Sequence, residues 1–293
     1  MKILDHFSES ESKTKNNEDV IGFSEIDENT SAVWVIDGGS SVADKNYIDS
    51  ENGDINWFAN SISRKLRAYS QIHKNYVDVL QNTIDDVKSE YVNCVGSLQN
   101  VPKYAWPIAA MTWVKFTKMN NGSQLVEQID LGDCSSIFRS DNSVWQIRPP
   151  AENLVENAIR SKIASMPKKK SGNDDEKRNT LIDGLRARRE EQHSFETPTI
   201  IGFNSKNINK IPYRRKIIHT DKIEFLLCSD GFFRLVDLFK KYSAHELIEK
   251  VSKIGSEKLV RELRNIEMDD KDCHTYPRLK ISDDVAVIFG VMN

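Results

Sequence analysis

Hydrophobic and polar positions follow two different periods along the chain. Short apolar runs that are rich in β-branched and aromatic residues, and that end in Gly, Asp or Asn, predict strands. The first strong run, Ala32–Ile36, is closed by Asp37-Gly38-Gly39. The other runs of this kind are Val20–Phe23, Ile108–Phe116, Leu125–Leu131, Ser136–Phe138, Val144–Ile147, Thr199–Phe203, Arg215–His219, Ile223–Cys228 and Val285–Val291. We therefore expect a protein built around β-sheets.

Apolar residues spaced three and four positions apart predict helices in three regions. The region Ile55–Val95 has this spacing over too great a length for one typical helix, so we expect two packed helices there. The region from Phe232 to about Ile266 shows the same spacing. Between about residues 149 and 194 we expect a short helix around Ile159, a solvated connector, and a charged helix that ends near Glu191.

The order of these segments indicates an α+β fold. Turn-forming residues, such as Asn120-Asn121-Gly122 and Ser140-Asp141-Asn142, separate neighbouring strands and favour antiparallel hairpins over β-α-β crossovers. Helices and strands in segregated runs are typical of layered α+β proteins. We expect two packed antiparallel β-sheets flanked by helices in a single domain, residues 1–293, with a charged helical insertion at about 149–194. The polar residues before about Asn17 are expected to be flexible at their start.

Composition agrees with a folded domain and excludes several classes of protein. The chain has 293 residues, of which 39% are hydrophobic, enough to build a core. Its 41 basic and 44 acidic side chains nearly balance, which excludes a globally basic nucleic-acid binder. No apolar stretch approaches the ~20 residues of a membrane span, and the chain does not start like a secretory signal. With four widely spaced cysteines, we expect a cytoplasmic protein with reduced thiols and no membrane contact.

Acidic residues stand at the borders of four predicted strands. They are Glu18 and Asp19 before Val20, Asp37 after Ile36, Asp230 after Cys228, and Asp283 and Asp284 before Val285. Taken singly, each is typical of a turn, because Gly tolerates positive φ and Asp bonds to the local backbone. Strand-border carboxylates from both ends of a chain can, however, converge at one end of a sandwich. Gathered there, they would repel one another unless cations neutralise them or their pKa values rise.

Hard divalent cations are the ions that such a cluster favours. Mg²⁺ and Mn²⁺ prefer carboxylate, carbonyl and water oxygens. The chain has no H-E-x-x-H pattern and no Cys/His cluster for zinc. It also has no G-x-x-x-x-G-K loop for ATP and no G-x-S-x-G element for a nucleophilic serine. The acidic residues therefore predict a Mg²⁺ or Mn²⁺ site.

In their order along the chain, these motifs resemble those of the metal-dependent Ser/Thr protein phosphatases of type 2C, the PPM family. The motifs are N-E-D at 17–19, apolar-apolar-D-G-G at 35–39, L-G-D at 131–133, L-x-S-D-G at 227–231 and D-D-x-x-V at 283–287. The resemblance runs roughly from Asn16 to Val291, except for the insertion. It implies two Mn²⁺ or Mg²⁺ ions between two sheets, and direct hydrolysis of phosphoserine or phosphothreonine in proteins by an activated water.

The resemblance also implies a role for each acidic residue. Asp37 would bridge both ions, and catalysis would depend on it and on Asp230. Asp283 would join Asp230 at one ion, whereas Glu18 and Asp19 would serve the other, Asp19 through water. The complete set of implied metal ligands is Glu18, Asp19, Asp37, the Gly38 carbonyl, Asp230 and Asp283.

The chain departs from the family at positions that bind phosphate or donate protons. The Arg that many members have soon after the Gly-Asp element is missing after Asp133, which we expect to support the ligands indirectly. In place of an amino-terminal Arg, the chain offers Lys13 and Lys15 as phosphate contacts, which lack the bidentate fork of Arg. Gly39 stands where some members have His, so no general acid is assigned. Arg234 stands where many relatives have an acidic ligand of a third metal, and is a further candidate contact to phosphate.

These departures leave more than one function open. The leading interpretation is an active metal-dependent phosphatase whose substrate is a phosphorylated protein. The alternative is a catalytically weak pseudophosphatase that acts as a binding or regulatory module, and a two-metal hydrolase of another phosphoester is a third interpretation. The basic runs at 168–170 and 186–189 are typical of a solvated surface, with docking of an acidic or phosphorylated partner as the alternative. Interleaved acidic residues argue against nucleic acid as that partner.

Overall fold

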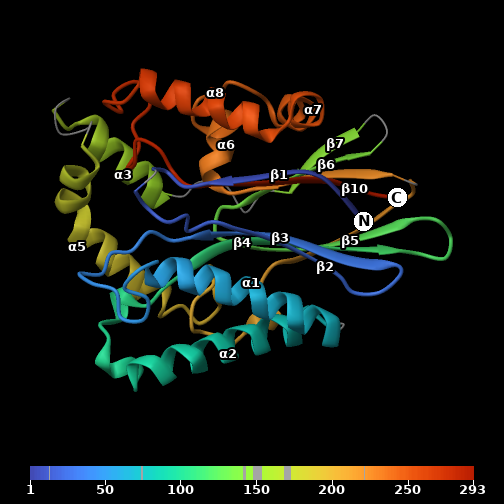
Figure 1. Ribbon diagram of the computed structural model, residues 1–293, viewed down its shortest axis with the longest axis horizontal. Coiled ribbons are helices and arrows are strands. Elements are labelled where there is room, and N and C mark those ends of the chain that lie inside the picture. The colour runs from blue at the N-terminus through green and yellow to red at the C-terminus, as the bar shows by residue number, and fades with distance from the viewer. Residues whose placement is uncertain (13, 74, 141–142, 148–153, 168–172, 221) are drawn as a thin grey trace.

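Two antiparallel sheets lie face to face, with helices on both outer sides (Figure 1). This computed structural model describes residues 1–293 except 13, 74, 141–142, 148–153, 168–172 and 221. The first sheet contains, in spatial order, β1 (Lys2–Glu9), β10 (Val285–Met292), β9 (Ile223–Cys228), β6 (Ser135–Ser140) and β7 (Ser143–Ile147). The second contains β2 (Val20–Glu25), β3 (Thr30–Gly38), β4 (Ala109–Lys118), β5 (Gln124–Leu131) and β8 (Tyr213–Ile218). The predicted α+β sandwich is confirmed.

Three groups of helices surround the two sheets (Figure 1). The second sheet is covered by α1 (Asp54–Ile72) and α2 (Tyr76–Val95). The first sheet is covered by α6 (Asp230–Asp237), α7 (Ala244–Ile254) and α8 (Ser256–Asp269). One end of the sandwich carries α3 (Leu154–Ala164) and α5 (Asp174–Gln192). Short 3₁₀ turns are η1 (Leu98–Asn100), η2 (Lys103–Ala105) and η3 (Ile208–Lys210).

Three hydrophobic layers hold these elements together. Between the sheets, Phe116, Phe138 and Phe225 are fully buried, and the rings of Phe116 and Phe225 lie 5.0 Å apart. Because side chains of a strand alternate between its faces, the opposite face of the second sheet points to the helices, where Trp34 packs in one cluster with Phe58 of α1. A third cluster joins the first sheet to α6, α7 and α8. Each layer removes apolar surface from water, which is the main force that favours this arrangement.

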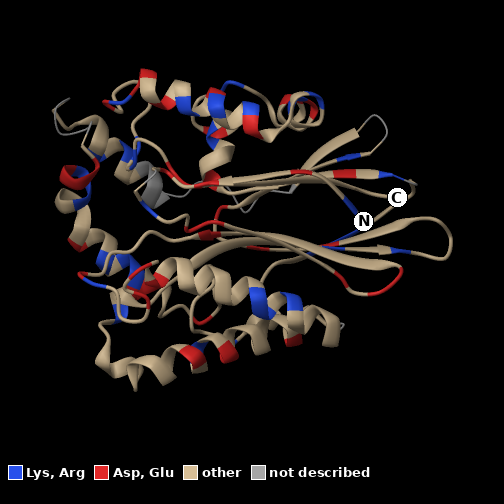
Figure 2. Cartoon of the chain, in the orientation of Figure 1, with Lys and Arg blue, Asp and Glu red and all other residues tan. Residues whose placement is uncertain are grey.

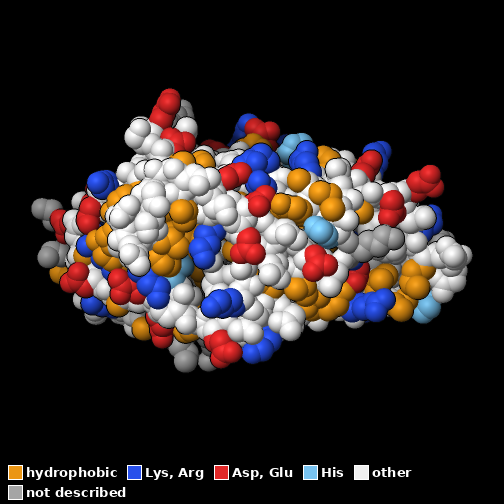
Figure 3. Space-filling model, turned by 90° about the horizontal axis from the view of Figure 1, so that it is seen from below, with side chains coloured by type: hydrophobic (Ala, Val, Ile, Leu, Met, Phe, Trp, Pro, Cys, Tyr) orange, Lys and Arg blue, Asp and Glu red, His pale blue; other side chains and the backbone are white. Residues whose placement is uncertain are grey.

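The outer surface of α1 and α2 is polar enough to face solvent. Lys65 of α1 forms ion pairs with Asp86 at 2.7 Å and Glu90 at 3.0 Å, both on α2. Seen from this side, hydrophobic side chains form separate patches between charged ones (Figure 3). The pair of helices predicted for this region is therefore amphipathic, with its apolar sides turned to each other and to the sheet.

The amino-terminal residues form a strand, so the prediction that they are flexible was wrong. β1 pairs antiparallel with β10, from Lys2 opposite Val291 to Glu9 opposite Val285. Its inward positions include Asp5, whose polarity interrupts the apolar alternation by which strands are recognised. The Asp5 carboxylate accepts the backbone N–H that begins α8, at 2.6 Å. A tertiary contact thus explains a polar residue in the middle of the strand.

The apolar run Thr199–Phe203 is not a strand, although its composition predicted one. Only Ile201 pairs there, in an isolated bridge with Ala109. The ring of Phe203 instead packs edge to face on Phe58, with centroids 5.7 Å apart. The run is apolar because it fills the core beneath α1, not because it belongs to a sheet.

The described residues of the charged insertion include two helices, α3 and α5. α5 ends at Gln192, next to the predicted end at Glu191. The basic run 168–170 and residues 141–142 of the predicted turn lie outside the described residues. Within the described ranges, no helix combines the length and the apolar character needed to cross a bilayer.

Candidate metal centre

The predicted acidic ligands lie at one end of the sandwich, where strands of both sheets begin or end. Glu18 and Asp19 precede β2, and Asp37 lies in the last residues of the neighbouring β3. Asp230 begins α6 directly after β9, and Asp283 precedes the neighbouring β10. Segments with Asp and Glu occur in both sheets at this end, which is the end that carries α3 and α5 (Figure 2). The fold therefore brings together residues that are more than 200 positions apart in sequence.

Two glycines allow the ligand-bearing segments to approach closely. A Cβ atom on Gly38 would lie 2.7 Å from the carbonyl oxygen of Glu18. A Cβ atom on Gly231 would lie 2.0 Å from the carbonyl oxygen of Asp284. Real Cβ atoms do not approach oxygen this closely, so any other residue would push the segments apart. The Asp-Gly pairs recognised in the sequence are thus needed for packing within each half of the site.

Asp284 connects the two sheets at this end. Its carboxylate accepts the backbone N–H groups of Glu11 and Glu18, each at 2.6 Å. Glu11 follows β1 of the first sheet, whereas Glu18 precedes β2 of the second. Asp284 therefore fixes the position of a predicted ligand, although it was given no role among the ligands, because a long-range bond to backbone has no sequence signature.

Burial raises the pKa values of the carboxyl groups at the centre. Burial raises the pKa of Asp37 well above its usual value, and the neighbouring Asp19 adds to this shift. Burial also raises the pKa of Asp19, which the Ser229 hydroxyl opposes only in part. For Glu18, burial raises the pKa to about 7. Burial thus favours the protonated forms of these groups, and a bound cation would favour their ionised forms.

The donor atoms fit a divalent cation. The Oδ2 atom of Asp19 is buried and accepts no hydrogen bond within the described part of the chain. A buried oxygen of this kind calls for a partner, and Mn²⁺ and Mg²⁺ are suitable ones. Among the described residues, no three Asp, Glu, His or Cys side chains form a ready-made cage. Asp19 and Asp230 are nevertheless close enough to Asp37 to raise its pKa, and Asp230 also raises the pKa of Asp19.

Asp283 differs from the other predicted ligands because two cations hold it. The Nζ atom of Lys280 lies 2.6 Å from its Oδ1, and the Nη2 atom of Arg234 lies 2.5 Å from its Oδ2. Burial acts to raise the pKa of Asp283, but Lys280 and Arg234 outweigh burial and keep that pKa below its usual value. Asp283 is therefore ionised and fixed in orientation, and a metal ion would share it with these cations.

The three predicted phosphate contacts lie in different environments. Lys13 lies outside the described residues. Lys15 is exposed and forms an ion pair with Glu11. Arg234 is only 8% exposed and pairs with two carboxylates, one of which is Asp283. Both described candidates are thus engaged by carboxylates of this chain.

Two cations at this end of the molecule were not predicted. Lys280 bridges Asp283 and Glu11, with an Nζ to Oε2 distance of 3.2 Å to the latter. Arg189, on α5, is 7% exposed and donates from Nη2 to carbonyl oxygens directly after the Asp37-Gly38 pair. No local motif marks either residue, because both reach the site through the tertiary fold.

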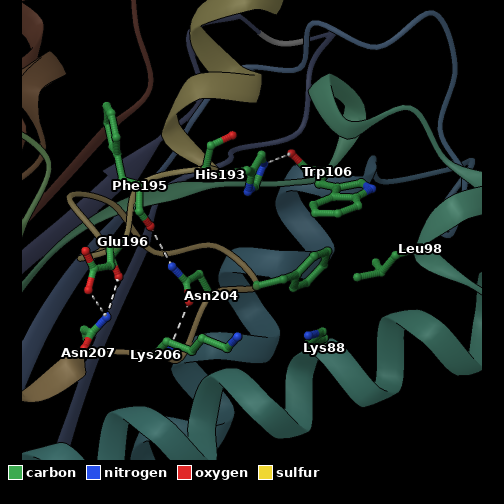
Figure 4. A pocket seen from close by; sticks show the side chains of 11 residues that line it. Lys88, Leu98, Trp106, His193, Phe195, Glu196, Asn204, Lys206 and Asn207 are labelled. Atoms are coloured by element: carbon green, nitrogen blue, oxygen red, sulfur yellow. Dashed lines mark hydrogen bonds between the residues drawn. The ribbon is translucent and has the colours of Figure 1, made fainter.

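A separate cavity of about 340 Å³ lies beside the carboxyl end of α5 (Figure 4). Of the described residues that line it, none is a predicted metal ligand. Several of its polar groups are bonded to one another. These bonds join His193 to Trp106, Asn204 to Phe195 and Asn207 to Glu196. These polar groups therefore have a structural role, because their bonds hold the segment that follows α5.

No protein-family model and no curated protein matches the chain. Solved structures of Ser/Thr phosphatases match it over nearly its whole length. Stp1 from Staphylococcus aureus has 13% identity and a TM-score of 0.49, over 98% of this chain and 94% of that one. The catalytic domain of PstP, in complex with two manganese ions, has 13% identity and a TM-score of 0.49, over 98% and 97%. PstP/Ppp from Mycobacterium tuberculosis has 14% identity and a TM-score of 0.48, over 100% and 99%.

Proposed function

We propose that this chain is a Mn²⁺- or Mg²⁺-dependent phosphatase that hydrolyses phosphoserine and phosphothreonine in proteins. One observation supports the proposal above all. Carboxylates from separate segments meet at one end of the sandwich, where burial and mutual repulsion raise the pKa values of Asp19 and Asp37. Such a cluster is stable in ionised form only with cations, and oxygen donors suit these two metals.

Different residues of this chain would bind each of the two metal ions. A pair of Mn²⁺ or Mg²⁺ ions, when bound, supplies an activated water and neutralises charge on the phosphoryl group. The ligands would be Asp37 for both ions with the Gly38 carbonyl assisting, Asp230 and Asp283 for one ion, and Glu18 and Asp19 for the other. Asp37 would bind in its ionised form, because a ligating carboxyl group must be ionised. Lys280 and Arg234 would orient Asp283 through their ion pairs.

We further propose that residues 1–293 act as one phosphatase-like domain with an insertion at about 149–194. The contacts of α5 support this, because Arg178 and Arg186 bond to carbonyl oxygens of the segment that follows β3. The four cysteines are free thiols, which suits a reducing compartment such as the cytoplasm.

A pseudophosphatase that binds partners without turnover is the second candidate. The ion pairs of Asp283 and of Lys15 favour it, because they engage a predicted ligand and a predicted phosphate contact. Such a protein would bind Mn²⁺ in a calorimeter and release no phosphate from a phosphopeptide. Efficient turnover would exclude it.

Phosphopeptide hydrolysis, measured with and without added Mn²⁺, tests the leading proposal. We expect wild-type protein to release phosphate only with metal, and EDTA to abolish the release. Asp37→Asn and Asp230→Asn should each remove the activity and leave the thermal unfolding curve largely unchanged. Asp78→Asn, on the exposed surface of α2, is the matched control and should retain activity. Activity that survives Asp37→Asn or EDTA would contradict the mechanism.

A further inference from the structure

Four Lys and Arg side chains are buried among the residues that the structure describes, and one of them stands apart. The other three each form an ion pair with a carboxylate. The pairs are Lys177–Asp174 at 2.8 Å, Arg234–Asp283 at 2.5 Å and Arg278–Asp270 at 2.6 Å. Arg189 is 7% exposed and forms no ion pair within the described residues. A buried charge without a counter-charge is costly, so its retention calls for an explanation.

Arg189 lies beside the candidate metal centre. Its Nη2 atom donates to the carbonyl oxygens of Gly39 at 3.3 Å and Ser40 at 3.1 Å. These residues directly follow Asp37 and Gly38 in the chain. Glu18, on the other side of the centre, is near enough to act on Arg189, but burial outweighs it and lowers the pKa of Arg189 to about 10. The guanidinium is thus charged, sheltered and adjacent to the predicted ligands.

Part of the guanidinium remains available. Arginine has five N–H groups, and the two on Nη2 of Arg189 account for the carbonyl contacts. Its Nε and Nη1 atoms have no hydrogen-bond partner among the described residues, nor are they fully enclosed. Because Cδ lies between Nε and Nη1, each of these nitrogens can donate a separate charge-assisted hydrogen bond to an oxyanion.

Other arginines of α5 fix the helix against the segment 39–44, which we call the 39–44 loop. Arg178 donates to the Ser41 carbonyl at 3.1 Å, and Arg186 donates to the Val42 carbonyl at 2.9 Å. Arg186 and Arg189 lie eight and eleven positions after Arg178, which places all three on one face of a helix. At its other end, α5 holds the segment before Asp283, because Asp174 accepts the Ile281 N–H at 3.1 Å. α5 therefore keeps Arg189 in a defined place.

We propose that Arg189 binds the phosphate of the substrate, with Nε or Nη1 as the donor. The inference rests on the proposed function and extends it to a residue of the insertion. Phosphate would supply the counter-charge that Arg189 lacks, and charge-assisted bonds to an oxyanion are among the strongest that arginine forms. Lys15, the described amino-terminal candidate for a phosphate contact, is instead paired with Glu11.

Binding of inorganic phosphate, measured by calorimetry with Mn²⁺ and again in EDTA, tests the proposal. Arg189→Met should weaken phosphate binding about 10- to 100-fold, and Arg189→Lys less, because Lys retains the positive charge. With p-nitrophenyl phosphate as substrate, KM should rise while kcat changes little. Arg188→Met, at the next position of α5, is the matched control and should bind phosphate like wild type.

Mn²⁺ affinity separates a phosphate contact from a purely structural role. Loss of a cation beside the centre should leave Mn²⁺ affinity unchanged or raise it, whereas a displaced 39–44 loop would lower it. Unchanged phosphate affinity in Arg189→Met, an equal loss in Arg188→Met, or a matching loss of Mn²⁺ affinity would overturn the proposal. If Arg189→Met does not fold, the several-fold loss expected of Arg189→Lys serves instead. If phosphate binding depends on Arg189 but the protein has no hydrolytic activity, the proposed function is refuted and the role of Arg189 in phosphate binding is not.

Discussion

Replacement of Glu18 by Gln tests the charge at the candidate centre independently of activity. In the folded, metal-free protein, burial raises the pKa of Glu18 from 4.5 to about 7. A carboxyl group with a raised folded pKa stabilises the fold fully below pH 4.5, and this contribution is lost as the pH rises through 7. Glutamine does not titrate, so the two proteins should differ in stability only where Glu18 is ionised.

The size of the effect follows from the pKa. Between about pH 5.5 and about pH 8.5, a pKa near 7 changes the free energy of unfolding by about 2 kcal/mol. Because Glu18 is only partly buried, screening reduces this value to about 1–2 kcal/mol. In EDTA, the stability of Glu18→Gln relative to wild type should rise by this amount from the lower pH to the higher one, and the two proteins should match only below about pH 4.5. His193, whose pKa burial lowers to about 4, also titrates differently in the two states, but it is common to both proteins and cancels.

Urea denaturation followed by tryptophan fluorescence provides the measurement. The quantity to compare is the difference in free energy of unfolding between variant and wild type at each pH. Glu51→Gln, at an exposed glutamate, is the matched control and should show no pH-dependent difference. Addition of Mn²⁺ at the higher pH should stabilise wild type more than Glu18→Gln. A difference that is the same at both pH values would refute the buried-carboxylate account of this site.

Three further substitutions test the packing that supports the site. Phe116→Ala should lower the free energy of unfolding by about 3–5 kcal/mol in urea denaturation, because the ring is fully buried between the sheets; a loss below about 1 kcal/mol would contradict the layered core. Asp5→Ala should cost about 0.5–2 kcal/mol, because its carboxylate accepts the first N–H of α8, and hydrogen exchange at that N–H should quicken. Arg234→Met should cost about 3–5 kcal/mol by leaving Asp283 without one of its cations, and an unchanged melting curve would show that the pair is not formed.

The sequence was sufficient to predict most of the layers. Trp34 and Phe116 lie in regular apolar runs, and such runs become strands wherever both faces are covered. β1 was not predicted, because Asp5 interrupts the alternation of apolar and polar residues in that strand. Thr199–Phe203 was wrongly predicted to be a strand, because an apolar run can fill a core without pairing in a sheet. In both cases a tertiary contact outweighed the local pattern.

Only those residues of the candidate site that belong to a local sequence motif could be predicted. Asp37 and Asp230 are followed by glycines at strand borders, and this local pattern marks them. Lys280 and Arg189 have no such pattern, because each is recruited by a contact between segments distant in the chain. The charges of α5 suggested a solvated surface, yet buried Arg189 shows that part of this helix faces inward.

The pairing of β1 with β10 has a consequence for the order in which the two sheets can form during synthesis. β10 lies between β1 and β9, so β1 has no neighbour in its sheet until residues 285–292 are present. Four strands of the other sheet, β2 to β5, are complete once residue 131 has been synthesised. On the ribosome, that half can form early, while β1 waits for β10. Asp283 and Asp284 arrive with that last strand, so the acidic cluster closes only when translation of the sandwich is finished.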